Sequence, residues 1–426
     1  MKPSFYMPLL VLCGTATLAW AEPSPEGLDG LRQQLTQLTQ LVQQLNTTVQ
    51  AQQQRLAVLE RAGGSAIAAA GAPPVVAPAP SSGGVANLAA FNPDIGLVGD
   101  LVGQLSSSSA DADGNRTVSA RQVEFVVGHA VDPYARFDAT VGLSETGTAD
   151  LEEAYLTHWG LPGDVRLRVG RLKPHVGKAV ASHLDSLDTV DEPLVVSRYF
   201  GSEGLSRTGV ELSRFLPLPW ETVTHELTAG VMEGGVGEGG TLFGSRRTRP
   251  SLYAHLKNFW DINETTNLEI GTTYLAGSTG DDPRFDVNAL GVDATVVHFV
   301  TPTHKLKWQS EAYLQRRDAS FRIAADGTRT DINSHPWGVY SLVDYRLSPR
   351  FGVGGRVDYV QPVGLDPSAR IRAGDTAWSG YLTLYQSEFA RWRLQYRRTD
   401  FASGGDDNAV FLQGTFAIGA HKHALQ

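Results

Sequence analysis

Cysteine and long apolar runs are almost missing from this sequence. Its 426 residues contain one cysteine, Cys13, near the N-terminus. No later stretch reaches the roughly 18–20 apolar residues of a membrane-spanning helix. These absences exclude a disulfide framework and a transmembrane helix. Basic runs are also missing and the net charge is −9, so we expect no nucleic acid among the partners.

Residues 1–21 have the features of a secretory signal peptide. Lys2 precedes a short apolar stretch, and residues 19–21 read Ala-Trp-Ala, the small-x-small pattern of a cleavage site. Leu12 stands before Cys13, where lipoprotein signals have a small residue, so lipidation is the less favoured alternative. A secreted chain with 45 glycines, 13 tyrosines and 8 tryptophans and many short alternating segments is expected to be all-β, either soluble or an outer-membrane barrel.

Residues 22–61 carry a heptad repeat. Ten positions follow one another at spacings of three and four residues, and all but Gln52 are apolar. The ten are Leu28, Leu31, Leu35, Leu38, Val42, Leu45, Val49, Gln52, Leu56 and Leu59. This pattern predicts a coiled coil with copies of itself or with a partner, and a helix lying on its own protein is the alternative. Residues 62–90 are rich in Ala, Pro, Gly and Ser and predict a linker.

Residues 91–426 contain sixteen candidate strands, the first centred on 92–105 and the last on 408–418. The even-numbered connections, such as AVDP and GLPG, are short, whereas the odd-numbered ones, such as SSSSADADGN, are long and polar. A membrane barrel has short periplasmic turns and long outer loops, and a soluble sandwich does not sort its loops in this way. The sequence therefore predicts an all-β transmembrane antiparallel β-barrel of about 16 strands in the outer membrane, with the coiled coil in the periplasm.

Each candidate strand has one apolar and one polar face. In residues 134–143, for example, Phe137 and Val141 share one face, while Arg136 and Asp138 share the other. A charge facing lipid costs about 2–4 kcal/mol at the midplane, so the charged face must line the lumen. A barrel of about 16 strands encloses an aqueous channel. The predicted pore-lining residues are Arg136, Glu153, Arg166, Arg168, Lys257, Glu311, Arg356, Arg391, Arg393 and Arg397.

One outer connection, about 172–207, is much longer than the others. Apolar residues such as Leu184, Leu194 and Phe200 favour packing inside the barrel as a constriction, and an external flap is the alternative. Its charged residues are Lys173, Lys178, Asp185, Asp188, Asp191, Glu192 and Arg198. Facing rows of opposite charge would orient solutes and rings of one sign would select ions, unless the charges simply pair across neighbouring strands.

The order of signal peptide, heptads, linker and sixteen strands with a long third outer loop resembles trimeric outer-membrane porins that carry an N-terminal coiled coil. Shorter phrases resemble the phosphate-selective-porin-like family and its relatives labelled zinc-regulated outer-membrane receptors. These phrases are FNPDIGLVGDLVG, VDPYARFD, LEEAYLTHWGLPGDVRLRVGRLKPHVGK, GLSRTGVELS, YLTLYQSEFARWRLQYRRTD and FLQGTFAIGAHKH. The resemblance implies a homotrimeric channel. The chain departs from a TonB-dependent receptor, which has about 22 strands and a plug, because a heptad helix precedes the barrel.

Zinc binding is the more specific chemical alternative to a general diffusion channel. Imidazole and carboxylate side chains suit zinc, and the candidate metal ligands are His175, His183, His421 and His423. No nucleophile elbow, paired catalytic carboxylate motif or metal-protease helix occurs, so we expect no enzyme and no cofactor. The expected function is passive diffusion of small hydrophilic or ionic solutes. A zinc-responsive uptake channel or receptor and an envelope tether are the alternatives, and the expected partners are outer-membrane lipid and other copies of the chain.

Overall fold

A computed structural model describes residues 93–108, 116–202, 204–220, 222–245, 247–280, 285–323, 325–363 and 374–419. The chain divides into two compact units, Met1–Gly84 and Val85–Gln426, and every element below belongs to the second. The predicted signal peptide, coiled coil and linker all lie outside the described residues. No helix in the described part of the chain is long and apolar enough to cross a membrane.

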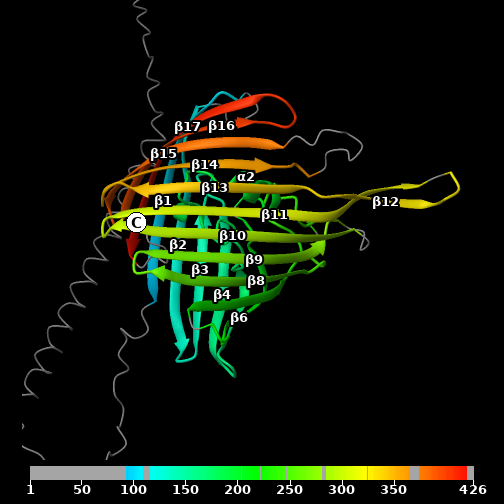
Figure 1. The fold of residues 1–426 in the computed structure, drawn as a ribbon, viewed down its shortest axis with the longest axis horizontal. Coiled ribbons are helices and arrows are strands. Elements are labelled where there is room, and N and C mark those ends of the chain that lie inside the picture. Colours follow the sequence, from blue (N-terminus) through cyan, green and yellow to red (C-terminus); the bar gives the residue numbers. More distant parts are fainter. Residues whose placement is uncertain are drawn as a thin grey trace, which may run out of the picture. The chain divides into compact units, whose positions relative to one another are not determined.

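Strands make up most of the described structure (Figure 1). They are β1 (Asp94–Ser106), β2 (Arg116–Asp132), β3 (Ala135–Leu143), β4 (Ala149–Leu161), β5 (Val165–Leu172), β6 (Arg207–Leu216), β7 (Val223–Met232), β8 (Ser251–Asn263), β9 (Thr266–Ser278), β10 (Asp286–Thr301), β11 (His304–Ile323), β12 (Arg329–Ser334), β13 (Trp337–Arg346), β14 (Phe351–Val360), β15 (Asp375–Ser387), β16 (Ala390–Asp400) and β17 (Asp406–Gly419). The helical pieces are a 3-10 turn, η2 (Leu184–Ser186), and α2 (Leu194–Tyr199).

The sheet closes on itself. Each strand pairs antiparallel with its neighbours, and β1 pairs with both β2 and β17, from Gly96 opposite Gly419 to Ser106 opposite Ala409. Strand β11 pairs with β13 along its first part and with β12 along its last part, so β12 and β13 share one place in the ring. The seventeen strands therefore occupy sixteen places, which confirms the predicted antiparallel barrel of about 16 strands.

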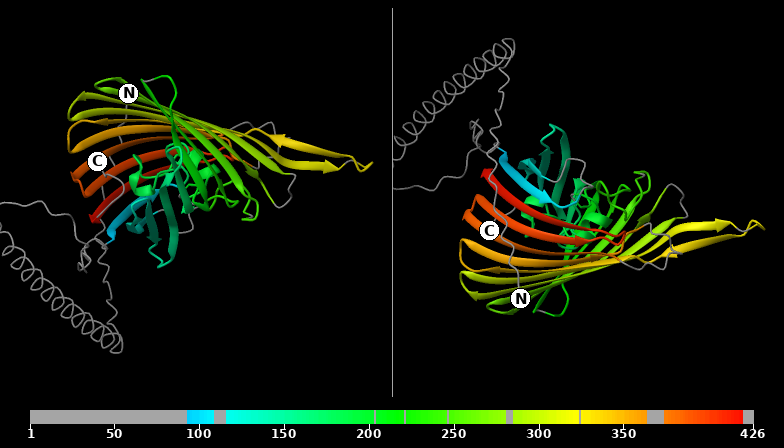
Figure 2. Two further views of the ribbon diagram at one scale, coloured as in Figure 1. Left: turned by 90° about the horizontal axis from the view of Figure 1, so that it is seen from below. Right: turned by 90° about the horizontal axis from the view of Figure 1, so that it is seen from above.

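The end of β11 and β12 form a hairpin that projects from the barrel (Figure 2). The segment RDASFRIAADGTRTDINSH, residues 317–335, is long and polar and is predicted to be one of the odd-numbered outer connections without strands. That prediction is wrong. Asp326-Gly327 forms the tip, and Gly327 has a φ of +83°. An Asp-Gly pair between residues of high β-propensity is a strong hairpin signal, because glycine adopts the left-handed conformation without strain.

The two rims of the barrel differ. We call the rim where β1 begins the inner rim and the opposite one the outer rim. Connections at the inner rim have two to six residues, whereas those at the outer rim range from five residues (144–148) to the long segment 173–206.

The predicted alternation of strand faces is present: on β3, Phe137 is 44% exposed on the outer surface and Asp138 is 7% exposed on the lumen side.

The long outer connection, residues 173–206, lies inside the barrel, and we call it the inner loop. Most of its apolar side chains form one buried cluster with inward-facing side chains of β7–β11 and β13–β15, whereas Val190 packs with side chains of β1 and β17. The ring of Phe200, for example, contacts that of Tyr313 edge-to-face at 4.9 Å between centroids. Helix α2 lies against β13 and β14. One wall of the lumen is therefore partly apolar, and the inner loop packs on it because both surfaces leave water.

Candidate functional site

The first half of the inner loop is held through its backbone N–H groups. Three of them donate to carboxylates on the lumen face of β4, β6 and β11: Lys173 to Glu153 at 3.1 Å, His175 to Glu211 at 3.0 Å, and Ala179 to Glu311 at 3.0 Å. Hydrogen bonds with an ionised partner are about twice as strong as neutral ones. The lumen carboxylates thus act first as anchors for the polypeptide backbone.

The second half of the inner loop is held through its carbonyl groups. Arg391 donates to the carbonyl of Asp185, and Arg393 donates to that of Leu187 at 2.9 Å. Arg356 donates to the carbonyl of Asp191 at 2.7 Å. Residues two apart on a strand face the same side, so β16 offers its arginines in a row along the extended loop. Carboxylates of the lumen accept hydrogen bonds from N–H groups of the loop, and arginines of the lumen donate hydrogen bonds to its carbonyl groups. Each charge thus meets a peptide atom of opposite partial charge.

Ion pairs add to this anchoring. Asp191 lies 3.0 Å from Arg356 and 2.8 Å from Arg397, and Asp188 lies 2.8 Å from Lys307. Burial alone would raise the pKa of Asp191, but the two guanidinium groups outweigh it and hold that pKa well below its ordinary value. The other pairs of loop side chains are Lys178 with Glu269 and Asp293, and Arg198 with Asp375. Glu192 accepts from Arg356 through its carbonyl.

The remaining predicted pore-lining residues also have partners. Arg168 lies 3.3 Å from Glu211 and over the ring of Tyr155. Arg166 and Lys257 both contact Glu226, at 2.8 Å and 2.7 Å. Arg136 pairs with Asp138 and Asp94 at the inner rim. The structure places all ten predicted residues on the lumen side, yet most of their charge is directed at the loop or at a neighbouring strand.

A β-bulge builds the most enclosed group of charges. Thr140 pairs with Glu153 and Val141 pairs with Leu151, so Glu152 is an extra residue in β4. The bulge directs both glutamates into the lumen, whereas strict alternation would direct only one. Both contact His183 of the inner loop, from Nδ1 to Glu152 at 3.0 Å and from Nε2 to Glu153 at 3.2 Å.

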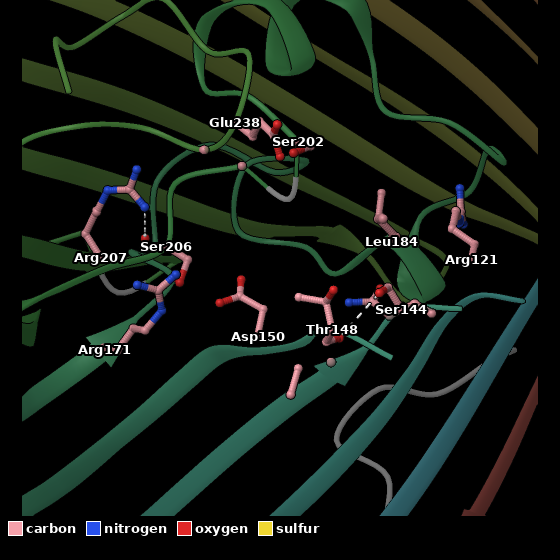
Figure 3. Close-up of a pocket in the computed structure, with 15 residues that line it drawn as sticks. Arg121, Ser144, Thr148, Asp150, Arg171, Leu184, Ser202, Ser206, Arg207 and Glu238 are labelled. Carbon is pink, nitrogen blue, oxygen red and sulfur yellow. Dashed lines mark hydrogen bonds between the residues drawn. The ribbon is translucent and has the colours of Figure 1, made fainter. Parts of the chain in front are cut away.

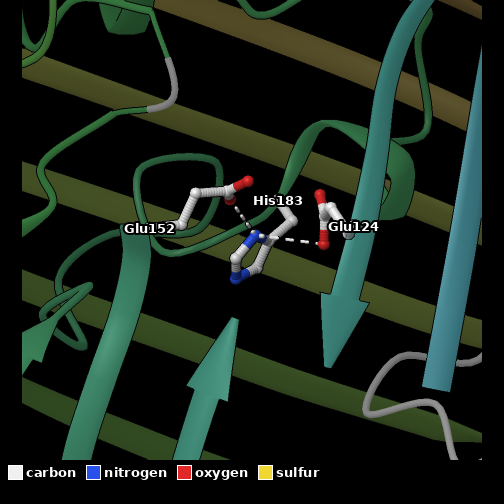
Figure 4. Close-up of side chains that lie close together, drawn as sticks. All are labelled: Glu124, Glu152 and His183. Atoms are coloured by element: carbon white, nitrogen blue, oxygen red, sulfur yellow. Dashed lines mark hydrogen bonds and ion pairs between the residues drawn. The ribbon is translucent and has the colours of Figure 1, made fainter. Parts of the chain in front are cut away.

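Glu124 of β2 approaches the same ring at 3.7 Å (Figure 4). Burial and the Lys173 ammonium group oppose a charge on His183. The hydrogen bonds to Glu152 and Glu153, together with the attraction of Glu124, outweigh them and raise the pKa of His183 to about 9. His183 is therefore an imidazolium that fastens the loop to β2 and β4.

The predicted metal ligands do not come together. His175 contacts Glu211 at 2.9 Å and the guanidinium group of Arg168, a cation that would repel a metal ion. His183 has ligand atoms within 4.8 Å of those of Glu124 and Glu152, so these three are the described residues that could hold a divalent ion. His421 and His423 lie outside the described residues.

Cavities lie on both sides of the inner loop. The outer one has a volume of about 440 Å³ and is lined by Arg121, Asp150, Arg171, Arg207 and Glu238, among others (Figure 3). The inner one, of about 360 Å³, is lined by Arg166, His175, Lys178, His255 and Lys257, among others. The loop therefore separates an outer from an inner aqueous space.

Two arginines of the outer cavity stand out because they have no ion pair with any described residue. Arg171 and Arg207 lie on the same side of the cavity (Figure 3), and the Nε of Arg171 is buried without a hydrogen-bond partner. Sequence reasoning missed both, together with Glu152. Arg171 pairs with Ala154 and Thr208 near the outer end of β5, and from there it lines the outer cavity.

Comparisons with known proteins place the fold. No family model matches the chain, so the resemblance to the phosphate-selective-porin-like family stays a prediction. The chain is 27% identical over 315 residues to an uncharacterized protein of Aquifex aeolicus (strain VF5), a match covering 68% of this chain and 66% of that protein.

Three solved structures are similar at TM-scores of 0.50–0.51. They are the outer membrane channel DcaP of Acinetobacter baumannii (14% identity, covering 77% of this chain and 98% of that one), OmpF of Salmonella typhi in complex with daunomycin (8%, 76% and 97%), and an anion-selective porin from Comamonas acidovorans (9%, 77% and 100%). The chain therefore has the fold of a porin-like β-barrel.

Proposed function

We propose that this protein is an outer-membrane channel through which small hydrophilic or ionic solutes diffuse passively. The observation that carries the proposal is the inner loop, anchored from both halves to the lumen wall and leaving a cavity on either side. A barrel of this strand number is wide enough for water, and a fixed loop across it narrows the path to a constriction. The apolar outer surface is what a lipid bilayer requires.

Two arginines of the outer cavity favour anions. Arg171 and Arg207 line it without an ion pair to a described carboxylate, while Asp150 and Glu238 line it as well. Cations fixed at the mouth of a narrow, low-dielectric path attract anions and repel cations. Anion selectivity named for the porin of Comamonas acidovorans agrees with this proposal.

Single-channel recording in planar bilayers under a KCl gradient tests both parts. We expect stepwise conductance and a reversal potential of the sign that favours chloride. The double variant R171Q/R207Q should shift the reversal potential toward zero, whereas the control R398Q, which removes an arginine at the rim that pairs with Asp400, should leave it unchanged. A barrel that inserts but never conducts would refute the channel, and an unchanged reversal potential in R171Q/R207Q would refute the anion site.

A metal-responsive channel is a second candidate, favoured by the closeness of Glu124, Glu152 and His183. Zinc added to the same recordings distinguishes it. Block by low concentrations of zinc that disappears in H183Q would support a zinc-responsive channel, and wild-type conductance that does not change with zinc would refute it.

A further inference from the structure

The outer cavity is lined by charged groups of both signs. Arg171 and Arg207 supply two guanidinium groups, and Asp150 and Glu238 supply two carboxylates. Figure 3 shows the carboxylate of Asp150 directed toward the side of the cavity where the two arginines lie. None of these four side chains has an ion-pair partner among the described residues. The cavity therefore presents positive and negative charge that the protein itself does not pair.

Separate parts of the chain bring these four groups together. Asp150 lies at the outer end of β4, Arg171 near the outer end of β5, and Arg207 at the start of β6. Glu238 belongs to the connection between β7 and β8. That connection is tied to the inner loop, because the N–H of Ser202 donates to the carbonyl of Glu238 at 2.9 Å. The charged lining is thus a product of the closed barrel and the seated inner loop together.

The two arginines are held in place without being neutralised. Arg207 donates from Nη1 to the carbonyl of Ser206 at 2.8 Å, and its Nε lies 3.2 Å from where a Cβ on Gly235 would stand. Arg207 is close enough to Arg171 to be repelled by it and close enough to Asp150 to be attracted. The Nε of Arg171 is buried without a hydrogen-bond partner, and such a donor costs free energy until an acceptor reaches it. A bound carboxylate would relieve both the repulsion and the missing bond.

The rest of the lining suits a small hydrophilic solute. Ser144, Thr148 and Ser202 contribute to it, and Leu184 is the only large apolar side chain among the described residues that line the cavity. The volume of about 440 Å³ gives room for on the order of ten water molecules. A solute of several non-hydrogen atoms therefore fits, and polar groups surround it on most sides.

We infer that the outer cavity binds small amphoteric solutes of the amino-acid class. The solute carboxylate lies between Arg171 and Arg207, and its ammonium group faces the carboxylates of Asp150 and Glu238. Arginine binds a carboxylate through two parallel hydrogen bonds, and an ammonium group offers three donors to carboxylates. A simple anion would satisfy the arginines alone, and a simple cation the acids alone. The inference deepens the proposed function and rests on it, because the solute reaches the cavity as it enters the channel.

Three matched solutes separate the two charges. L-Serine carries an ammonium group and a carboxylate, glycerate has a hydroxyl in place of the ammonium group, and ethanolamine is serine without the carboxylate. Each is added at neutral pH to the full-length protein in planar bilayers, and the concentration that halves the single-channel current is measured. We expect serine to act at a several-fold lower concentration than either analogue.

The wild type alone can decide against the inference. Equal effects of serine and glycerate would overturn it, because the acids would then take no part in binding. A conducting channel whose current does not respond to serine would also overturn it and would leave the proposed channel intact. A protein that never conducts would refute the proposed channel and, with it, the inference.

Two double variants assign the effect to the cavity. In R171Q/R207Q we expect serine to act no better than ethanolamine, and in D150N/E238Q no better than glycerate. The control R398Q, altered at the rim, should respond as the wild type does. The conductance of each variant in KCl alone shows whether it is folded, and the comparison of the three solutes on the wild type needs no variant. An advantage of serine that persists in both double variants would overturn the inference, because serine would then bind elsewhere.

Discussion

His183 lies between the two halves of the inner loop and fixes the loop to β4. Before it, N–H groups of the loop donate to lumen carboxylates. After it, lumen arginines donate to carbonyl groups and the N–H of Leu194 donates to Asp358. Its own ring contacts Glu152 and Glu153. The charged groups that face the ring are Glu124, Glu152, Glu153, Asp185 and Lys173. Neither the histidine nor either glutamate is unusual in the sequence. The bulge that joins them depends on the pairing of β3 with β4, and no local pattern reveals it.

The charge on His183 makes stability depend on pH. Its folded pKa of about 9 lies above its ordinary value of 6.5, so its contribution is fully present below pH 6.5 and is lost as the pH rises through 9. A shift of this size corresponds to about 3 kcal/mol. We expect the free energy of unfolding in urea, measured in vesicles, to fall more between pH 6 and pH 10 for the wild type than for H183Q. H304Q, altered at the inner end of β11, should behave as the wild type. A pH dependence in H183Q equal to that of the wild type would contradict this assignment.

Gly177 tests the fit of the loop against the barrel wall. Its φ is +60°, and a Cβ there would collide with the carboxylate of Glu311, which accepts the N–H of Ala179. We expect G177A to destabilise the protein by about 1–3 kcal/mol through backbone strain and the lost anchor. Gly147 is the control, because it has a positive φ of 78° but open space around it, so G147A should cost only the strain. Equal losses of stability in the two variants would show that the contact with Glu311 is unimportant.

At the scale of elements, the strands were largely predictable and the use of their charges was not. Two-residue alternation locates β5 at 165–172 and β14 at 351–360 to within a residue, because one face of each must avoid lipid. The same alternation puts Arg391 and Arg393 in the lumen. It cannot show that their partners are backbone carbonyls, because those carbonyls lie about 200 residues away in the chain.

The arginine row of β16 gives the next prediction. R391Q/R393Q removes the donors to the carbonyls of Asp185 and Leu187, while Asp191 keeps Arg397. Two hydrogen bonds from charged groups together contribute about 3–6 kcal/mol. We expect a matching loss in the free energy of unfolding, and a larger, noisier single-channel conductance as the loop loosens. R398Q on the same strand serves as control. A conductance equal to that of the wild type would show that the loop does not set the width of the path.

At the scale of the whole molecule, the closed barrel follows from the sequence, whereas the split of the lumen into two cavities does not. Sixteen alternating segments and sorted loop lengths suffice for closure. The cavities depend on where the inner loop rests, and that position results from many contacts with β4, β6, β11, β14 and β16 at once.

Deletion of residues 22–61 distinguishes a channel function from an envelope-tether function. We expect the shortened protein to keep the single-channel conductance of the full chain, because the inner loop and both cavities belong to residues beyond 120. If the barrels assemble as the resemblance to trimeric porins implies, we expect the shortened protein to dissociate at a lower detergent concentration, because it lacks the predicted self-association of the heptads. Native mass measurement and bilayer recording check both expectations. Loss of conductance on deletion would contradict the channel as an independent unit.

The way the inner loop is anchored has a consequence for biogenesis. Glu153 and Arg168, which anchor its beginning, lie on strands made before it. Glu311 lies on β11, and further anchors lie on β14 and β16, near the end of the chain. Long-range contacts of this kind form late, because the intervening chain must first be ordered. The loop therefore cannot take its final place until the last strands have joined β1. A barrel whose last strands have not yet paired would lack its constriction and would leak solutes. Leakage, and not a misfolded structure, would then be the sign of unfinished assembly.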